Sequence, residues 1–253
     1  MRSLARKALK AAMLARVPAW REALRQGVAA SIEHDRLPLR RDFRTVIDVG
    51  ANRGQFALCS TVRFPEAQVF SLEPLRGPRA KMQALFAGSP RVQVIPKAAG
   101  ASAGRAKVNV SGADDSSSLL AMGELQLRRY PETKMVGAEE VDVDTLDGIF
   151  GGMELASPVL LKLDVQGFEL EALKGAKELL GRVDAVLTEA SFVPFYEGQA
   201  LFDDLHALLT EAGFSLVSGA MSSQAGGRWE QGDFLYERDA VGVGQAARGD
   251  AAA

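Results

Sequence analysis

The chain is poor in cysteine and histidine. Its 253 residues include a single cysteine, Cys59, and two histidines, His34 and His206. One cysteine excludes an intramolecular disulfide and is consistent with a reducing compartment. Cys59 lies in an expected helix, where a small buried hydrophobe is the simplest interpretation. Two histidines are too few for a histidine-rich metal site, and His206 is expected to be a half-exposed helix residue.

Long hydrophobic runs and an excess of one charge are also missing. The 30 lysine and arginine residues nearly balance the 32 aspartate and glutamate residues, for a net charge of −2. This balance gives no reason to expect a nucleic-acid partner. Lys10 and Arg16 interrupt the apolar sequence near the N-terminus. We therefore predict no targeting signal and no membrane span, and we expect a cytoplasmic protein.

The composition is that of a folded globular protein. Hydrophobic residues make up 47% of the chain and charged residues 25%. The length suits one α/β domain with an appendage. We predict a helical N-terminal extension over residues 1–43, a main domain over 44–239, and a disordered tail over 240–253, which lacks the hydrophobes to fold.

The N-terminal extension is basic and has a helical pattern. Apolar residues recur at roughly helical spacing, at Leu4, Leu9, Met13, Val17, Trp20 and Leu24. Pro18 is expected to break or restart the helix. Three interpretations stay open: a helical extension that packs on the main domain, a lid over a substrate site, or a basic amphipathic helix that meets anionic lipid. We favour packing and regard membrane contact as the weakest of the three.

From Arg44 onward, strand-like and helix-like segments alternate. We expect strands at 45–49, 68–73, 91–95, 158–164 and 183–188, and helices at 54–63, 77–86, 168–180 and 202–212. This βαβαβ order predicts a parallel sheet with right-handed crossovers. Residues 214–218 and 232–237 are expected to pair as a closing antiparallel ribbon.

The alternation is interrupted between residues 100 and 144. Residues 107–110 and 140–143 alternate like half-exposed strands, on either side of a polar cluster at 112–118. Insertions of this length often carry substrate-facing structure.

The first expected strand leads into a turn with two glycines. The dinucleotide fingerprint G-x-G-x-x-G requires a second glycine where the backbone approaches a pyrophosphate, and here Asn52 stands in that place. A ligand without phosphate removes that requirement, and S-adenosylmethionine fits. Asp48 could attract its amine or sulfonium, while backbone N–H groups near Gly54 and Gln55 could meet its carboxylate. The cofactor-binding residues predicted in this turn are Asp48, Gly50, Ala51, Asn52, Gly54, Gln55 and Phe56.

An acid at the end of the second strand is the second part of this signal. Glu73 follows Gly50 by 23 residues, close to the spacing of about 20 expected for a carboxylate that accepts from both ribose hydroxyls. Pro74 helps to end the strand there and, like Glu73, is predicted to bind the cofactor. Ser117, within the polar cluster, could hydrogen-bond adenine or substrate, and a simple polar loop is the alternative.

Two further acids end later strands. Asp164 and Glu189 are expected at the rim beside the first strand, with Lys162 on the same side of its strand as Asp164. Asp164 is the first candidate for a catalytic base or an acceptor-positioning group, and Glu189 is the second. Lys162 could lower the pKa of a neighbouring carboxylate or contact the acceptor. Ion pairing and loop capping are the structural alternatives. With no clear third ligand, no metal site is predicted.

Several segments resemble the FkbM family of S-adenosylmethionine-dependent methyltransferases. They are residues 48–56, 72–75, 116–120, 143–147, 161–169, 196–199 and 213–214. The segment at 161–169 reads Leu-Lys-Leu-Asp-Val-Gln-Gly-Phe-Glu and is quite specific to the family. The resemblance covers about residues 44–238 and leaves residues 1–43 outside.

The resemblance implies a class I methyltransferase fold: a Rossmann-like seven-stranded α/β sheet with helices on both faces and an antiparallel last strand. It also implies O-methylation of a hydroxyl on a sugar, a glycolipid or a polyketide-type natural product. Two alternatives stay open. One is a nicotinamide-dependent oxidoreductase on a related fold, against which Asn52 argues. The other is a non-catalytic binding module that keeps the fold.

Overall fold

A computed structural model describes residues 10–113 and 115–239 of the chain. The basic start of the extension, Asp114 of the polar cluster, and the tail predicted over 240–253 lie outside the described residues.

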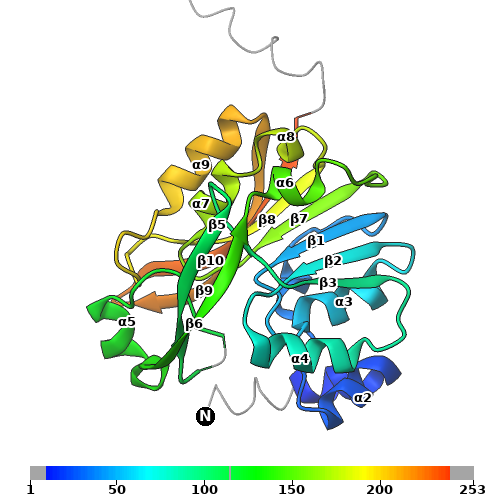
Figure 1. The fold of residues 1–253 in the computed structure, drawn as a ribbon, viewed down its shortest axis with the longest axis horizontal. Helices are drawn as coiled ribbons and strands as arrows, with labels where there is room; N and C mark the ends of the chain where they lie inside the picture. The colour runs from blue at the N-terminus through cyan, green and yellow to red at the C-terminus, as the bar shows by residue number, and fades with distance from the viewer. Residues whose placement is uncertain (1–9, 114, 240–253) are drawn as a thin grey trace, which may run out of the picture.

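A seven-stranded sheet forms the centre of the molecule (Figure 1). Its order is β3-β2-β1-β7-β8-β10-β9. The first five of these strands are parallel, and β10 runs antiparallel to both β8 and β9. The strands are β1 (Thr45–Val49), β2 (Gln68–Leu72), β3 (Val92–Ile95), β7 (Val159–Leu163), β8 (Ala185–Ser191), β9 (Phe214–Ala225) and β10 (Arg228–Arg238). This sheet confirms the predicted class I methyltransferase fold.

Helices cover both faces of the sheet, so β1 and β7 are buried on both sides. Val46 packs with apolar residues of α3 (Gln55–Arg63) and α4 (Arg76–Leu85). Ile47 packs in a second core on the opposite face. The helices of that second core are α6 (Leu146–Phe150), α7 (Glu169–Lys174), α8 (Lys177–Leu180) and α9 (Phe202–Glu211). Burial on two faces explains why these strands are continuous hydrophobic runs.

The single helix predicted over 168–180 is wrong, because two short helices, α7 and α8, occupy this stretch. The chain turns at Gly175, where a Cβ atom would lie 2.1 Å from the Gly100 carbonyl oxygen. This close backbone contact requires glycine, and glycine also disfavours continuation of a helix.

The insertion forms a separate three-stranded sheet. Its order is β4 (Ala98–Ala99), β6 (Met135–Asp144) and β5 (Gly104–Ser111), with α5 (Glu124–Arg129) and the 3₁₀-helix η2 (Pro131–Thr133) between β5 and β6. The strands predicted at 107–110 and 140–143 lie within β5 and β6, which are longer. The closing ribbon is likewise longer than predicted and turns at Gly226 and Gly227.

The described part of the N-terminal extension packs on the main domain. Residues 10–16 are helical, α2 (Pro18–Arg25) begins at Pro18, and the 3₁₀-helix η1 (Glu33–Arg36) follows. Leu14 and Trp20 join a core with Leu58 and Cys59 of α3, and the Trp20 indole N–H donates to the Leu58 carbonyl at 3.1 Å. Cys59 is buried, as predicted. Among the residues described, no helix has the length and apolar character needed to cross a bilayer.

Candidate active site

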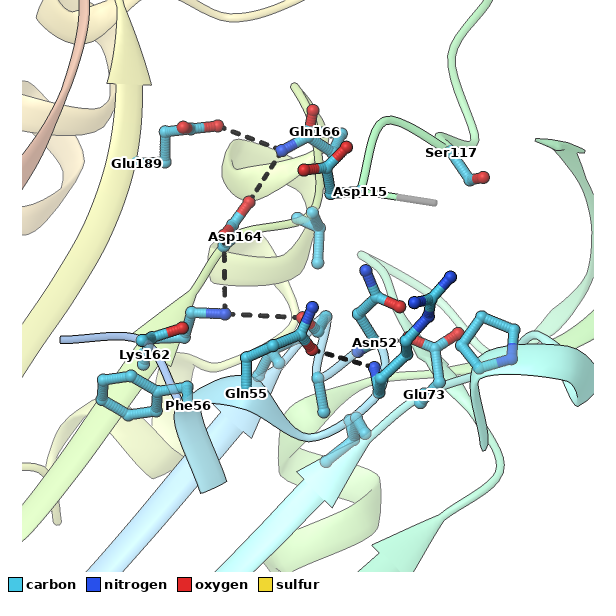
Figure 2. Close-up of a pocket in the computed structure, with 18 of the residues that line it drawn as sticks. Asn52, Gln55, Phe56, Glu73, Asp115, Ser117, Lys162, Asp164, Gln166 and Glu189 are labelled. Carbon is cyan, nitrogen blue, oxygen red and sulfur yellow. Dashed lines mark hydrogen bonds and ion pairs between the residues drawn. The ribbon is translucent and has the colours of Figure 1, made fainter. Parts of the chain in front are cut away.

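A cavity of about 530 Å³ opens where β1, β2 and β7 end. The turn after β1, the end of β2, the loop after β7, the insertion and the N-terminal extension all contribute to its wall. Figure 2 shows Asn52 and Glu73 toward one side of this space and Asp164, Gln166 and Glu189 toward the other. The carboxyl edge of a parallel sheet is the usual position for a ligand in such a fold.

The glycine turn forms the floor of the cavity. Gly50 has φ +80°, and a Cβ atom there would lie 1.9 Å from the Asp164 carbonyl oxygen. The N–H groups of Gly50 and Ala51 donate to the Leu72 carbonyl at 3.1 and 2.9 Å. The turn therefore folds tightly across the ends of β2 and β7. The predicted residues of this turn that line the cavity are Gly50, Ala51, Asn52, Gln55 and Phe56.

Gly54 is not among the described residues that line the cavity. Its φ is +86°, and a Cβ atom there would lie 2.8 Å from the ring of Phe86 and 2.9 Å from Met82. Gly54 therefore lies directly before α3 and packs against Met82 of α4. It shapes the turn without lining the cavity.

Asp48 also lies off the cavity wall. Its side chain is fully buried, and its Oδ1 lies 3.1 Å from Nζ of Lys162, the residue opposite it in the β1–β7 register. Burial alone would lower the pKa of Lys162, but Asp48 and then Asp164 raise it above its ordinary value. The sequence predicts that Asp48 contacts the ligand; the structure instead makes it the counter-ion of a charged lysine that does line the cavity.

Glu73 is a buried carboxylate on the opposite side of the cavity. It is 5% exposed, and its two oxygens accept from the N–H groups of Asn52 and Leu75, each at 2.8 Å. Burial raises its pKa to about 7, although these hydrogen bonds oppose the shift. A carboxylate oxygen accepts more than one hydrogen bond, so capacity remains for hydroxyl donors. Pro74 lies beside it on the wall.

Asp164, Gln166 and Glu189 form a connected group (Figure 2). The Gln166 side-chain nitrogen donates to Asp164 at 2.8 Å and to Glu189 at 3.2 Å. The Tyr196 hydroxyl donates to the amide oxygen of Gln166 at 2.8 Å, which fixes the orientation of that amide. Nζ of Lys162 lies 3.7 Å from Oδ2 of Asp164. Burial, and then the charges of Asp164 and Asp233, hold the pKa of Glu189 well above its ordinary value.

Glu169 is a buried acid that the sequence does not mark as a site residue. It is 3% exposed, accepts from the N–H groups of Val165 at 2.8 Å and Gly167 at 3.3 Å, and has its pKa raised to about 7 by burial. One oxygen each of Asp164, Glu169 and Glu189 lie within 4.8 Å of one another. Glu169 is thus a third acid beside the two that the sequence identifies, and the absence of a metal site stays a prediction.

The insertion reaches the cavity through its serines. Ser117 lines the wall, and its hydroxyl accepts from the Ser111 N–H at 3.0 Å. The Ser118 hydroxyl donates to the Gln166 carbonyl at 2.7 Å and so ties the insertion to the loop after β7. Three aromatic residues after β8, Phe192, Phe195 and Tyr196, are not part of the described lining, and Phe195 and Tyr196 are core residues.

The N-terminal extension contributes to the cavity wall. A lid over a substrate site was one of the three interpretations left open for it, although sequence reasoning named none of its residues as site residues. Residues of this extension line the same cavity, namely Lys10, Gly27, Ala29, Ser31, Glu33 and His34. Sequence reasoning also missed Asp233 on β10 and Gln166. Gln166 has φ +56°, a conformation that non-glycine residues rarely adopt, and it lies within the most specific motif of the chain. That motif is the signal that could have identified Gln166.

Comparisons with known proteins agree with this geometry. Residues 48–216, more than half of the chain, match the "Methyltransferase FkbM domain" family. A curated relative, the 2-O-methyltransferase NoeI of Sinorhizobium fredii, is 28% identical over 160 residues, which cover 61% of this chain and 66% of the relative. The match thus spans slightly less than two thirds of that protein.

Solved structures that match this chain have little sequence in common with it. A putative S-adenosylmethionine-dependent methyltransferase from Listeria monocytogenes is 10% identical, with a TM-score of 0.47 over 82% of this chain and 98% of that one. A TehB-like SAM-dependent methyltransferase from Corynebacterium glutamicum is 12% identical, with a TM-score of 0.46 over 92% and 100%.

The family match includes the glycine turn, Glu73, Asp164, Gln166 and Glu189, which lie on the floor and on both sides of the cavity. The chain belongs to the FkbM methyltransferase family.

Proposed function

We propose that this protein is an S-adenosylmethionine-dependent O-methyltransferase that acts on a hydroxyl of a sugar, a glycolipid or a polyketide-type natural product. One observation carries the proposal: a single cavity has the buried Glu73 carboxylate on one side and the Asp164–Glu189 group on the other, across the glycine turn. Family membership and the 2-O-methyltransferase named among the relatives support the reaction class.

The donor half of the cavity suits the cofactor. Glu73 would accept from the two ribose hydroxyls, and Pro74 and Ser117 would flank the adenosine. The N-terminus of α3, at Gln55, would face the amino-acid carboxylate, since helix N-termini attract anions. The Lys162 ammonium lies over the ring of Phe56 and places a positive charge near this region. When bound, S-adenosylmethionine supplies a methyl group on a sulfonium, which is a good leaving group.

The chain's main task is then to hold the acceptor in line with that methyl group. Orientation of this kind can lower a barrier by about 7–11 kcal/mol. We assign Asp164 as the residue that positions the acceptor hydroxyl. Glu189, on the same side of the cavity, is the second candidate for this role. Lys162 and Gln166 hold the Asp164 side chain in place.

Binding of S-adenosylhomocysteine, measured by isothermal titration calorimetry, tests the cofactor assignment. We expect saturable binding, and no heat of binding at millimolar ligand would refute it. Methyl transfer from labelled S-adenosylmethionine to a panel of methyl pyranosides tests the acceptor class.

Asp164→Asn should slow methyl transfer by about 100-fold, because loss of the charge misplaces the acceptor. Its affinity for S-adenosylhomocysteine should stay within about twofold of wild type, since the donor half of the cavity is intact. Asp142→Asn is the matched control, because the Asp142 side chain is 69% exposed on β6. A loss of cofactor affinity equal to the loss of turnover would contradict the assignment.

A further inference from the structure

The N-terminal extension supplies part of the cavity wall from outside the family match, which begins at residue 48. We call residues 27–32, which lead from α2 to η1, the strap. Gly27, Ala29 and Ser31 of the strap line the cavity. Proteins that share a fold differ mainly in the loops that face their ligands, so a wall of this kind is a candidate for acceptor specificity.

Side chains along the strap alternate between the core and the cavity. Val28, Ala30 and Ile32 are buried in the core that the extension shares with α3. Ala29 and Ser31, which stand between them in the chain, are half-buried and line the cavity. Successive side chains of an extended segment point to opposite sides, which accounts for this pattern.

Backbone and ring contacts hold the strap against α3. The Ser31 N–H donates to the Gln55 carbonyl at 3.1 Å. Directly after the strap, the ring of His34 packs edge-on against Phe56, with 5.3 Å between the centroids. A lid would have to break these contacts and expose the buried side chains of the strap each time it opened. The strap is therefore a fixed wall of the cavity and not a lid.

The strap runs from the start of α3 to the carboxylate side of the cavity. Gln55 is the first residue of α3, where we place the amino-acid end of the cofactor. At the other end, Nε2 of His34 lies 3.7 Å from Oδ1 of Asp233, which stands opposite Glu189 in the β10–β8 register. An acceptor held beside Glu189 would thus have the strap along one side.

The strap presents only small residues to the cavity, namely Gly27, Ala29 and Ser31. Its larger apolar side chains, Val28 and Ile32, take the core side. A longer side chain at position 29 would therefore project into the cavity.

We propose that the strap sets the size of the acceptor, with Ala29 as a specificity-determining residue that leaves room for a second sugar ring beside the one that is methylated. This inference rests on the proposed O-methyl transfer to a sugar hydroxyl. It makes the acceptor a disaccharide or longer glycoside.

The first test compares a methyl pyranoside with a methyl disaccharide that contains the same sugar. Wild type should methylate both. Ala29→Leu should lower kcat/KM for the disaccharide by about 10-fold or more relative to the pyranoside, since added methylenes in a pocket discriminate by factors of this size. Ala15→Leu is the matched control and should keep the wild-type ratio, because Ala15 is exposed in the same extension and is not among the described residues that line the cavity.

The second test measures access to the strap without turnover. Cys59 is the only cysteine of the chain and is buried, and burial raises the pKa of its thiol to about 12, so Ala29→Cys adds the one reactive thiol. We expect an aromatic disulfide to label Ala29→Cys in the presence of S-adenosylhomocysteine. Addition of the disaccharide should then slow the labelling. Full protection by S-adenosylhomocysteine alone would show that the strap borders the cofactor and would overturn the proposal.

The two proposals fail in different ways. Binding of S-adenosylhomocysteine to Ala29→Leu shows that this variant folds. If wild type methylates the pyranoside but rejects the disaccharide, or if Ala29→Leu keeps the wild-type ratio, only the role of the strap is refuted. If wild type binds S-adenosylhomocysteine but methylates no glycoside hydroxyl, the proposed acceptor class fails and the role of the strap fails with it.

Discussion

Glu73 combines deep burial with two backbone hydrogen bonds, and this makes its charge sensitive to what occupies the cavity. Its pKa of about 7 lies well above that of an exposed glutamate. Ribose hydroxyls would donate to the ionised form and so favour it. The affinity for S-adenosylhomocysteine should therefore rise as the pH increases toward 8 and then level off.

Glu73→Ala should lower that affinity by about 10- to 100-fold, because hydrogen bonds to a charged group are worth about 1.5–3 kcal/mol. It should also remove the pH dependence. Calorimetric titrations at pH 6, 7 and 8 measure both effects. Glu140→Ala, which removes a 70% exposed side chain on β6, serves as the control. Unchanged affinity of Glu73→Ala would rule out the ribose assignment.

Glu169 makes a different prediction, which concerns stability. Its pKa rises from an ordinary 4.5 to about 7 in the folded protein, so the native state holds this proton more tightly than the unfolded chain. The stability that it contributes is fully present below about pH 4.5 and is lost as the pH rises through 7. A shift of this size corresponds to roughly 3 kcal/mol.

Glu169→Gln cannot ionise but can still accept from Val165 and Gly167. Relative to this variant, wild type should therefore lose free energy of unfolding between pH 5 and pH 8. Urea unfolding across that range gives the difference. Parallel pH profiles for the two proteins would contradict the prediction.

At the scale of elements, the turn between β1 and α3 depends on one glycine. Gly50 combines a φ of +80° with backbone contact to Asp164, so both conformation and space exclude a side chain. Gly50→Ala should destabilise the protein by several kcal/mol and weaken S-adenosylhomocysteine binding, because Asp164 and the floor of the cavity must move apart.

Gly104→Ala is the matched control, since a Cβ atom at Gly104 in β5 would meet nothing within 4 Å. This control should change the free energy of unfolding by less than about 0.5 kcal/mol. Thermal unfolding and calorimetry measure both variants. Equal stability of the two variants would show that the turn tolerates a side chain.

The elements differ in how well their sequence predicts them. The strands β1, β2 and β7 were predicted to within one residue at each end, because strands buried on both faces are continuous apolar runs that end at an acid or a turn. The break between α7 and α8 was not predicted, because its cause is the contact of Gly175 with Gly100, a residue distant in the chain. The extra length of β5, β6, β9 and β10 comes from their pairing partners and not from their own composition.

At the scale of the whole molecule, the N-terminal extension is part of both the core and the site. Trp20 packs in the core that this extension shares with α3 and donates to the Leu58 carbonyl. Trp20→Phe should lower the free energy of unfolding by about 1–2 kcal/mol through the lost hydrogen bond and a small cavity. Trp229→Phe is the control, because Trp229 is 52% exposed and should be neutral within about 0.5 kcal/mol.

The two tryptophans of the chain also allow a test of cooperativity. In Trp229→Phe, the remaining Trp20 reports on the extension alone. We expect its fluorescence transition in urea to coincide with the loss of circular dichroism, since the extension shares a core with α3. A fluorescence transition at lower urea would show that the extension detaches first.

The sequence by itself determined the sheet, the glycine turn and the positions of Glu73 and Asp164 directly after β2 and β7, with Lys162 near the end of β7. Local patterns suffice there, because parallel strands carry their ligand groups at one edge. Glu189 was predicted to follow its strand but lies within β8, which continues to Ser191. Only the tertiary structure decided which of these side chains reach the cavity. Asp48 follows the same local pattern as Glu73, yet its pairing with Lys162 across the β1–β7 register buries it. Likewise, His34 and Asp233 lie at opposite ends of the chain, and they meet only because the N-terminal extension packs over the sheet beside β10. No periodicity in a sequence records a contact of that kind, since it depends on how separate elements pack and not on the residues within either one.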